Sequence, residues 1–173
     1  MLDRLIALLI ELWNDFKPIL FVQEYKMGVL LRGGKFIKIL SPGWHLKIPF
    51  VDEYVLDYVK ADTMRISEVN ITTLDERTIT IGCEFDLKVV DIYLALIETN
   101  EWRSNLHDIC QGILSDSLED TNWEDIRRKP IKNSIQRKIE TRAQEMGVNI
   151  SNFNFTDKAI SRAFKLFTNA VKL

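Results

Sequence analysis

The chain has 173 residues, of which 46% are hydrophobic and 28% are charged, and its formal net charge at pH 7 is -2. This length and balance fit one globular unit, or two small units that share an interface, without disulfide or metal staples. So small a net charge excludes a general attraction to nucleic acid or to anionic lipid.

Residues 2–16, LDRLIALLIELWNDF, predict a helix that separates its polar and apolar side chains completely. The polar side chains fall on one arc of about 120°, and Pro18 ends the helix. A bilayer span needs about 20 mostly apolar residues, so we expect this helix to lie on the membrane surface. The residues expected to bind the membrane are Leu2, Leu5, Ile6, Leu9, Ile10, Leu12, Trp13 and Phe16.

A second interpretation of this helix stays open, in which its apolar face packs on the chain's own core or on a neighbouring subunit. The apolar arc is wider than one packing contact needs, which favours the membrane. Because the polar face is not basic, binding would be hydrophobic, and it would be reversible unless assembly multiplied it.

After Pro18 the pattern changes to short strands. Turn signals at Gly33-Gly34 and Ser41-Pro42-Gly43 separate short apolar runs. Turns at this spacing predict an antiparallel meander. The expected strands are 19–22, 29–31, 36–40 and 44–50.

The strongest strand signal runs from Thr78 to Val90. Alternate residues are apolar, which predicts one buried face and one wet face. Residues 64–72 are expected to pair with this strand through a turn at 74–76. The apolar face consists of Ile79, Ile81, Cys83, Phe85, Leu87 and Val89.

The second half of the chain is mainly helical. Asp91 is expected to cap a short helix through Ile97, and Asn100 to cap the next. The second of these helices has a one-sided apolar face, and a third begins near Pro130 and stops at Gly147. The expected apolar positions are Leu106, Ile109, Cys110, Ile113 and Leu114 in one helix, and Ile131, Ile135, Ile139 and Met146 in the other.

Two more elements close the chain. The apolar residues from Val148 to Phe155 predict a strand with a bulge, because their spacing slips by one. A last helix has apolar residues at 4-3-4 spacing, the opening of a heptad seam about two heptads long. The residues expected to mediate oligomerisation are Ile160, Phe164, Phe167 and Val171.

Two stretches of the amino-acid sequence resemble a known family. Residues 24–36 read EYKMGVLLRGGKF and residues 41–52 read SPGWHLKIPFVD. Both resemble the opening of the SPFH (band 7) domain of stomatins, prohibitins, flotillins and the bacterial subunits that regulate a membrane-bound AAA protease. The resemblance covers about residues 19–165. It implies an α+β fold, with an SPFH-type antiparallel β-sheet subdomain followed by a mixed α/β subdomain.

The resemblance also implies association with a membrane face and assembly through neighbouring SPFH domains and a long C-terminal coiled coil. This sequence departs from the pattern at both ends, with a short amphipathic helix in place of the usual anchor and no long coiled coil before Leu173. We therefore expect a membrane-surface helix over 1–17, an SPFH domain over 18–157 and a truncated helix over 158–173.

Nothing in the sequence indicates catalysis, a metal or a cofactor. His45 and His107 have no partner at ligand spacing, and Cys83 and Cys110 fit small core residues. No phosphate loop, nucleophile elbow or zinc signature is present. We predict no catalytic residue and no cofactor.

A basic stretch is the remaining candidate for binding phosphate. Residues 127–129, together with Lys132, Arg137, Lys138 and Arg142, suit lipid headgroups or nucleic acid. Nearby glutamates and aspartates favour a solvated helix face instead, and no aromatic residues alternate with these charges, as nucleic-acid binding would favour.

Two functions remain for the chain. The first is a peripheral membrane scaffold, expected at the cytoplasmic face, that assembles with itself and organises lipid or regulates a partner such as a membrane protease. The second is a soluble adaptor or inhibitor that joins or caps another SPFH assembly. Vesicle flotation separates them.

Overall fold

The computed structural model describes residues 18–126 and 129–160. The predicted helix over residues 1–17 lies outside the described residues. The chain divides into two compact units that interleave in sequence. Among the described residues, one unit comprises 18–62, 87–105 and 143–150, and the other comprises 63–86, 106–126, 129–142 and 151–160. The sequence predicted two subdomains that follow one another along the chain, whereas the two units interleave in sequence.

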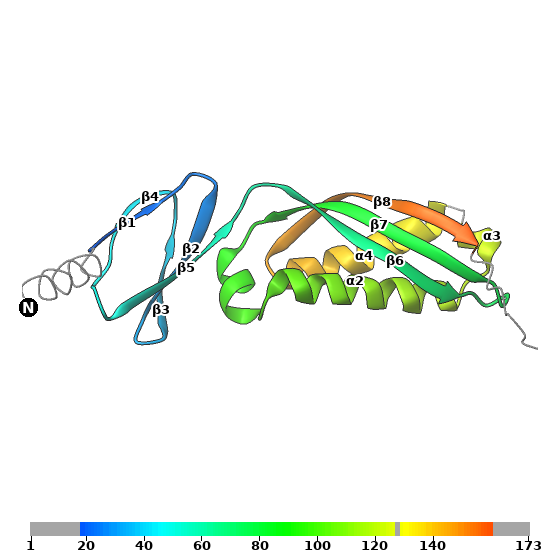
Figure 1. The fold of residues 1–173 in the computed structure, drawn as a ribbon, viewed down its shortest axis with the longest axis horizontal. Helices are drawn as coiled ribbons and strands as arrows, with labels where there is room; N and C mark the ends of the chain where they lie inside the picture. The colour runs from blue at the N-terminus through cyan, green and yellow to red at the C-terminus, as the bar shows by residue number, and fades with distance from the viewer. Residues whose placement is uncertain (1–17, 127–128, 161–173) are drawn as a thin grey trace, which may run out of the picture. The chain divides into compact units, whose positions relative to one another are not determined.

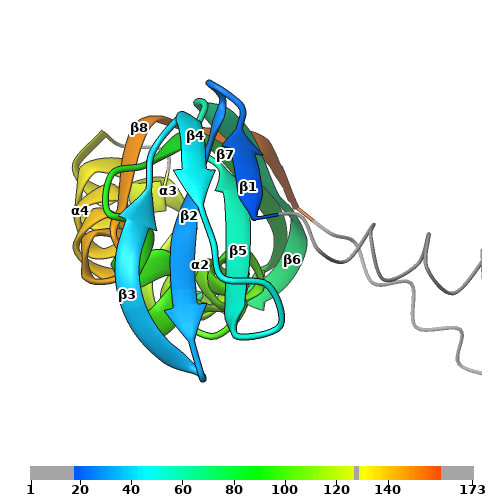
Figure 2. The same cartoon turned by 90° about the vertical axis from the view of Figure 1, so that its left-hand side faces the viewer.

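The first unit contains two small antiparallel sheets (Figures 1 and 2). One has two strands in the order β1-β4, and the other has three in the order β3-β2-β5. The strands are β1 (Ile19–Val22), β2 (Lys26–Arg32), β3 (Lys35–Leu40), β4 (Gly43–Leu46) and β5 (Asp52–Tyr58).

The core of these strands lies between the two sheets. Leu20 and Val22 on β1 are buried in one cluster with Leu30 and Leu40, and Leu56 packs against it. Burial of four aliphatic side chains is the main force that joins the two ladders.

The predicted strands and their antiparallel pairing are present, but the predicted meander is wrong. β4 pairs with β1, and β5 pairs with β2, so strands that are not consecutive lie side by side. β4 also ends at Leu46, although a strand to Phe50 was predicted. Pro49 cannot donate to a ladder, and Phe50 has a positive φ of 65°, so the chain turns there.

A short π-helix, η1 (Leu94–Glu98), follows in the same unit. The predicted cap is confirmed, because the Asp91 carboxylate accepts hydrogen bonds from the backbone N–H groups of Tyr93 and Leu94, at 2.9 and 3.3 Å. The carbonyl of Gly147 accepts from the N–H groups of Val90 and Asp91. Gly147 has a φ of 73°, and a Cβ there would lie 2.3 Å from the Asp91 carbonyl oxygen.

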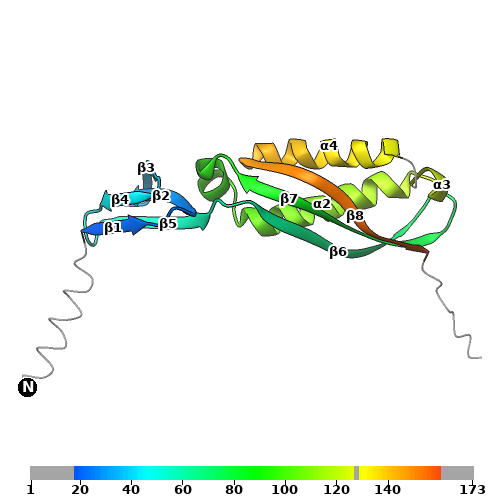
Figure 3. The same cartoon turned by 90° about the horizontal axis from the view of Figure 1, so that it is seen from above.

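The remaining sheet has the order β6-β7-β8 (Figure 3). The predicted alternation on β7 is confirmed, since Ile79, Ile81, Cys83 and Phe85 are fully buried. The elements are β6 (Asp62–Thr72), β7 (Thr78–Val89), α2 (Trp102–Glu119), α3 (Trp123–Ile126), α4 (Lys129–Glu145) and β8 (Val148–Ile160).

Helices α2 and α4 lie along this sheet (Figures 1 and 3). Their fully buried residues recur at every fourth position, which is the spacing of one helix face. They are Leu106, Cys110, Leu114 and Leu118 on α2, with Ile135, Ile139 and Ala143 on α4. Antiparallel sheets combined with these helices make the predicted α+β fold.

The predicted bulge in β8 is confirmed. Val148 and Ile150 are buried, and the next buried residue is Phe153, three positions on. Asn152 between them has a φ of 54°, so the backbone takes up the extra residue there. β8 runs on to Ile160, although the last helix was predicted to begin at residue 158, so that prediction is wrong for residues 158–160. Phe164, Phe167 and Val171 lie outside the described residues.

Candidate functional site

In the two-stranded ladder of β1 and β4, strand β1 is apolar on both of its faces. All four residues of β1, Ile19 to Val22, are large and apolar, and alternate ones are buried. Ile19 pairs with Leu46, and Phe21 pairs with Trp44. Since Leu20 and Val22 point into the core, these two cross-strand pairs form the outward face.

This outward face is open to solvent within the described part of the chain. Trp44 and Leu46 are 74% and 73% exposed, and Ile19 and Phe21 are about half exposed. The rings of Phe21 and Trp44 are tilted against each other, with centroids 4.9 Å apart. A contiguous set of exposed large apolar side chains on a folded domain marks an interaction surface.

The loop after β4 extends the apolar set. Ile48 and Phe50 are exposed, Phe50 to 75%. Phe50 has a positive φ of 65°, which is uncommon for a bulky residue, and its phenyl ring is displayed to solvent. The outward apolar face therefore comprises Ile19, Phe21, Trp44, Leu46, Ile48 and Phe50.

A partly buried ion pair fixes this loop. Arg32 donates from Nε to Oδ1 of Asp52 at 2.6 Å and from Nη2 to Oδ2 at 3.0 Å. Asp52 Oδ2 also accepts from the N–H of Ile48 at 2.7 Å. The hydrogen bonds from Arg32, and then that from Ile48, lower the pKa of Asp52 from 3.8 to about 2. One carboxylate thus joins the end of β2 to both ends of the loop that displays Phe50.

Lysine ammonium groups lie over tyrosine rings in the same unit. Lys47 Nζ is 5.4 Å from the ring of Tyr54, and Lys26 Nζ is 5.0 Å from the ring of Tyr58. Lys60 Nζ likewise lies 5.4 Å from Tyr25. In residues 18–126 and 129–160, no carboxylate forms an ion pair with any of these lysines. Such lysines keep a free positive charge beside an aromatic surface, the combination found at lipid headgroups.

The outward apolar face was not predicted from the sequence. The membrane-binding residues it predicted, Leu2 to Phe16, lie outside the described residues and stay a prediction. The sequence did contain one indication of this face, because Ile-Leu-Phe-Val is apolar at every position of a four-residue strand. Such a run indicates burial on both faces. Nothing in the sequence showed that only one face of β1 would be buried against other residues.

The predicted core cysteines are confirmed. Cys83 and Cys110 are free thiols with no exposed surface. Burial raises the pKa of each thiol to about 12, so neither is a reactive thiolate at neutral pH.

The two histidines lie at the margin of the surface. His45 Nε2 is 2.6 Å from the Ser41 carbonyl oxygen, and His107 Nδ1 is 3.4 Å from the carboxylate of Asp108. Among the described residues, no group of three or more His, Cys, Asp or Glu side chains could hold a metal ion.

The acidic pair Asp75-Glu76 forms the β6–β7 turn, as predicted. Asp75 accepts hydrogen bonds from the Thr73 hydroxyl at 2.6 Å and from the Trp123 N–H at 3.2 Å. These bonds, with the Thr73 hydroxyl first, lower the pKa of Asp75. Its role is to hold the turn, with Arg77 paired to it at 3.0 Å.

The structure describes only part of the basic stretch. Arg127 and Arg128 lie outside them. Lys132 donates to Asn154 at 2.8 Å and Lys138 donates to Ser117 at 2.9 Å. These lysines lie on α4 and bind local side chains, which fits a solvated helix face.

No helix in the described ranges is both long and apolar enough to cross a bilayer.

Comparison with known proteins supports the resemblance found in the sequence. The family model of the SPFH domain / Band 7 family matches residues 20–165. An uncharacterised protein of Methanocaldococcus jannaschii is 23% identical, over 84% of this chain and 74% of its own length. Protein HflK of Vibrio parahaemolyticus is 28% identical, over 78% of this chain and 35% of its own length. Human mitochondrial stomatin-like protein 2 is 24% identical, over 80% of this chain and 40% of its own length. This chain thus spans well under half of the HflK and stomatin-like relatives.

Proposed function

The chain belongs to the SPFH domain / Band 7 family, and on that premise we propose that it is a peripheral membrane scaffold that assembles with itself. It binds lipid through the outward apolar face, together with the amphipathic helix predicted for residues 1–17. It acts by holding lipid or a partner protein in place and catalyses no reaction.

The observation that carries the proposal is the exposure of six large apolar side chains on one ladder and its following loop. Full burial of such a side chain is worth about 1.5–3 kcal/mol. Because each side chain is already partly covered, its transfer to lipid would gain roughly 1 kcal/mol. Six together give a binding energy large enough for reversible attachment, and the unpaired lysines nearby add attraction to phosphate.

The position of β1 in the chain supports a shared surface with the predicted helix. β1 begins at Ile19, directly after Pro18, so no linker separates it from residues 1–17. A chain that enters β1 from a helix on the membrane can place both on one lipid surface. Two weak contacts on one molecule then reinforce each other.

The proposed partner is a membrane protein, such as a membrane protease, at the cytoplasmic face. The resemblance to subunits that regulate a membrane-bound protease supports this choice. The relatives named HflK are longer than this chain, so the partner remains a proposal at the level of the family.

Vesicle flotation tests the proposal with a matched pair of variants. Trp44→Glu with Leu46→Glu places two charges on the outward apolar face, whereas Leu74→Glu with Val90→Glu charges two similarly exposed apolar residues elsewhere. We expect the first variant to lose at least about tenfold of its partition into vesicles, and the second to float like the parent. Equal flotation of both variants, each shown to be folded by circular dichroism, would contradict the proposal.

A further inference from the structure

Two tyrosines and two lysines form a tyrosine–lysine cluster where β2 begins and β5 ends. The rings of Tyr25 and Tyr58 are stacked, with centroids 5.7 Å apart and an angle of 11° between their planes. Lys26 Nζ lies 5.9 Å from the centroid of the Tyr25 ring and 5.0 Å from that of the Tyr58 ring. Lys60 Nζ lies 5.4 Å from the centroid of Tyr25. Both ammonium groups therefore lie beside the same ring.

Backbone hydrogen bonds fix the framework of this cluster. Tyr25 belongs to a turn in which the N–H of Lys26 donates to the carbonyl of Gln23 at 2.9 Å. The Tyr25 carbonyl accepts from the N–H of Val59 at 3.1 Å, which ties the turn to the chain just after β5. Lys26 and Tyr58 are paired across β2 and β5, so their side chains lie on the same face of the sheet. The fold thus brings these side chains together.

The tyrosine–lysine cluster offers hydrogen-bond donors that no group of the described chain uses. Neither Lys26 nor Lys60 has an ion-pair partner there, and no protein group accepts from the hydroxyls of Tyr25 and Tyr58. An ammonium group only donates hydrogen bonds, and a tyrosine hydroxyl can donate one. Tyr58 is 53% exposed and Lys60 is also exposed, so a ligand can reach them. Four such donors suit an anion with several acceptor oxygens.

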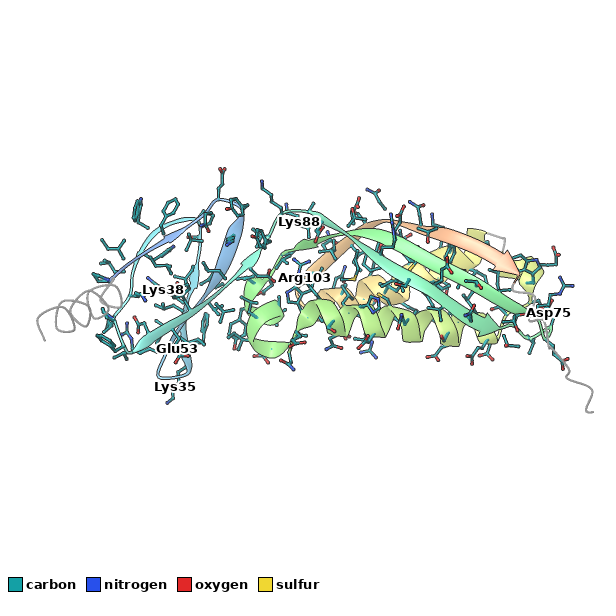
Figure 4. The ribbon with its side chains drawn as sticks, viewed as in Figure 1. Lys35, Lys38, Glu53, Asp75, Lys88 and Arg103 are labelled. Atoms are coloured by element: carbon teal, nitrogen blue, oxygen red, sulfur yellow. The ribbon has the colours of Figure 1, made fainter. Side chains whose placement is uncertain are left out.

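The neighbouring carboxylates do not neutralise the two lysines. Asp57 accepts from the indole N–H of Trp102 at 2.8 Å and lies 3.8 Å from the guanidinium of Arg103 (Figure 4). Asp62 pairs with the same guanidinium at 3.1 Å. Glu24, in the turn before β2, is exposed and forms no ion pair among the described residues. The cluster therefore keeps an excess of positive charge, although the chain as a whole has a net charge of -2.

We propose that Tyr25, Lys26, Tyr58 and Lys60 bind the phosphate group of an anionic ligand, and that the ligand is an anionic phospholipid. The ammonium groups supply positive charge, and the tyrosine hydroxyls supply directed donors to the phosphate oxygens. The stacked rings hold both lysines beside one site and limit their conformational freedom. This inference rests on the proposed membrane function. It adds a selectivity for anionic lipid to the hydrophobic binding by the outward apolar face.

Flotation with two kinds of vesicle tests the selectivity. The full-length chain is floated with vesicles of phosphatidylcholine alone and with vesicles that also contain phosphatidylglycerol, at one ionic strength. A lysine near an anionic surface strengthens binding about fivefold. Lys26→Gln with Lys60→Gln should therefore lose at least about tenfold of its partition into the anionic vesicles, while it binds the neutral vesicles like the parent. Tyr25→Phe with Tyr58→Phe keeps the rings but removes the hydroxyls, and should lose a smaller part of the same selectivity.

A matched control removes the same charge elsewhere. Lys35 and Lys88 are also exposed (Figure 4), and Lys35→Gln with Lys88→Gln should leave most of the selectivity in place. Equal losses in the two lysine variants would mean that only net charge matters, and would overturn the site. A parent that binds both kinds of vesicle equally would also overturn it. A parent that binds anionic vesicles but not neutral ones would instead count against the outward apolar face alone.

An NMR titration distinguishes a lipid headgroup from a free phosphate compound. The backbone amide signals of Tyr25, Lys26, Val59 and Lys60 are followed as glycerol 3-phosphate is added, with sodium chloride at equal ionic strength as the reference. We expect the vesicle selectivity without saturable shifts of these signals, which identifies the lipid headgroup as the ligand. Saturable shifts that the Lys26→Gln, Lys60→Gln variant lacks would support the phosphate site but replace the lipid with a soluble compound. Absence of both the selectivity and the shifts would overturn the inference.

Discussion

The rings of Phe21 and Trp44 contact each other on the outward side of the β1–β4 ladder, with centroids 4.9 Å apart. Directly beside Phe21 in the chain, Leu20 points the other way and is buried in the core. One four-residue strand thus has both a structural face and an exposed apolar face.

This difference predicts that neighbouring substitutions in β1 act on different properties. Leu20→Ala should lower the free energy of unfolding by about 2–5 kcal/mol, because it opens a cavity in the core. Phe21→Ala should lower it by about 1 kcal/mol or less, since it removes mainly a contact with Trp44. Chemical denaturation measures both. In vesicle flotation the order should reverse, with Phe21→Ala the weaker binder among folded proteins. A large loss of stability for Phe21→Ala would mean that its ring belongs to the core.

The Arg32–Asp52 pair predicts an unequal effect of removing each partner. The Asp52 side chain is fully buried, whereas that of Arg32 is 43% exposed. Asp52→Asn leaves an arginine that can turn to solvent, but Arg32→Leu leaves a buried carboxylate without its strongest donor. Arg32→Leu should therefore lower the thermal midpoint at neutral pH more than Asp52→Asn does. The reverse order would contradict the burial assigned to the carboxylate.

The same pair predicts how stability changes in acid. The pKa of Asp52 is about 2 in the folded chain and has an ordinary value of 3.8. A carboxyl group whose pKa falls on folding stabilises the fold fully above its unfolded value, and this contribution is lost as the pH falls toward the folded value. The parent should thus lose stability between about pH 4 and pH 2, and Asp52→Asn should lack that component. Denaturation curves across this range measure the difference, and parallel curves would contradict it.

Gly147 predicts a backbone effect. Its φ is 73°, and a Cβ would lie 2.3 Å from the Asp91 carbonyl oxygen. Gly147→Ala should therefore destabilise the chain by at least about 1–3 kcal/mol. Gly112→Ala is the control, because a Cβ there meets nothing within 4 Å, and it should be neutral or slightly stabilising. Equal effects of the two substitutions in thermal unfolding would contradict the steric argument.

The parts of the fold that could be predicted from sequence are those with a local pattern. β7 alternates, α2 and α4 repeat every three to four residues, and Gly147 and Asp91 carry stop and cap signals. The outward apolar face and the Arg32–Asp52 pair could not be predicted in this way. They depend on β4 returning to β1 and β5 to β2, which are pairings between distant residues. No local rule distinguishes these pairings from a meander.

The helix predicted for residues 1–17 gives a separate test. Because the described strands begin only after Pro18, a chain without residues 1–17 should fold with a cooperative thermal transition. Leu9→Glu with Trp13→Glu in the full chain should weaken flotation while leaving that transition unchanged. An aggregated or non-cooperative truncated protein would indicate that the helix packs on the core, which is the second interpretation of its apolar face.

Assembly should depend on the membrane. The helical seam predicted from Ile160, Phe164, Phe167 and Val171 loses Ile160 to β8, and its other three residues lie outside the described residues. Confinement to a membrane raises the effective concentration of subunits and so favours association without any new contact. Mass photometry should therefore detect monomers or small oligomers in dilute buffer and larger ones in detergent micelles or on lipid. A ring that resists dilution in plain buffer would contradict this.

The most direct test of the central claim asks whether the outward apolar face enters lipid. Leu46→Cys is labelled with a polarity-sensitive, thiol-reactive fluorophore. The label reacts selectively at this position because Cys83 and Cys110 are buried. Leu74→Cys is labelled in the same way as the matched control. On addition of phosphatidylethanolamine/phosphatidylglycerol vesicles, the emission of the label at Leu46 should shift to the blue and that at Leu74 should not. Emission at Leu46 that stays at its value in water, while the protein is bound to the vesicles, would contradict the account.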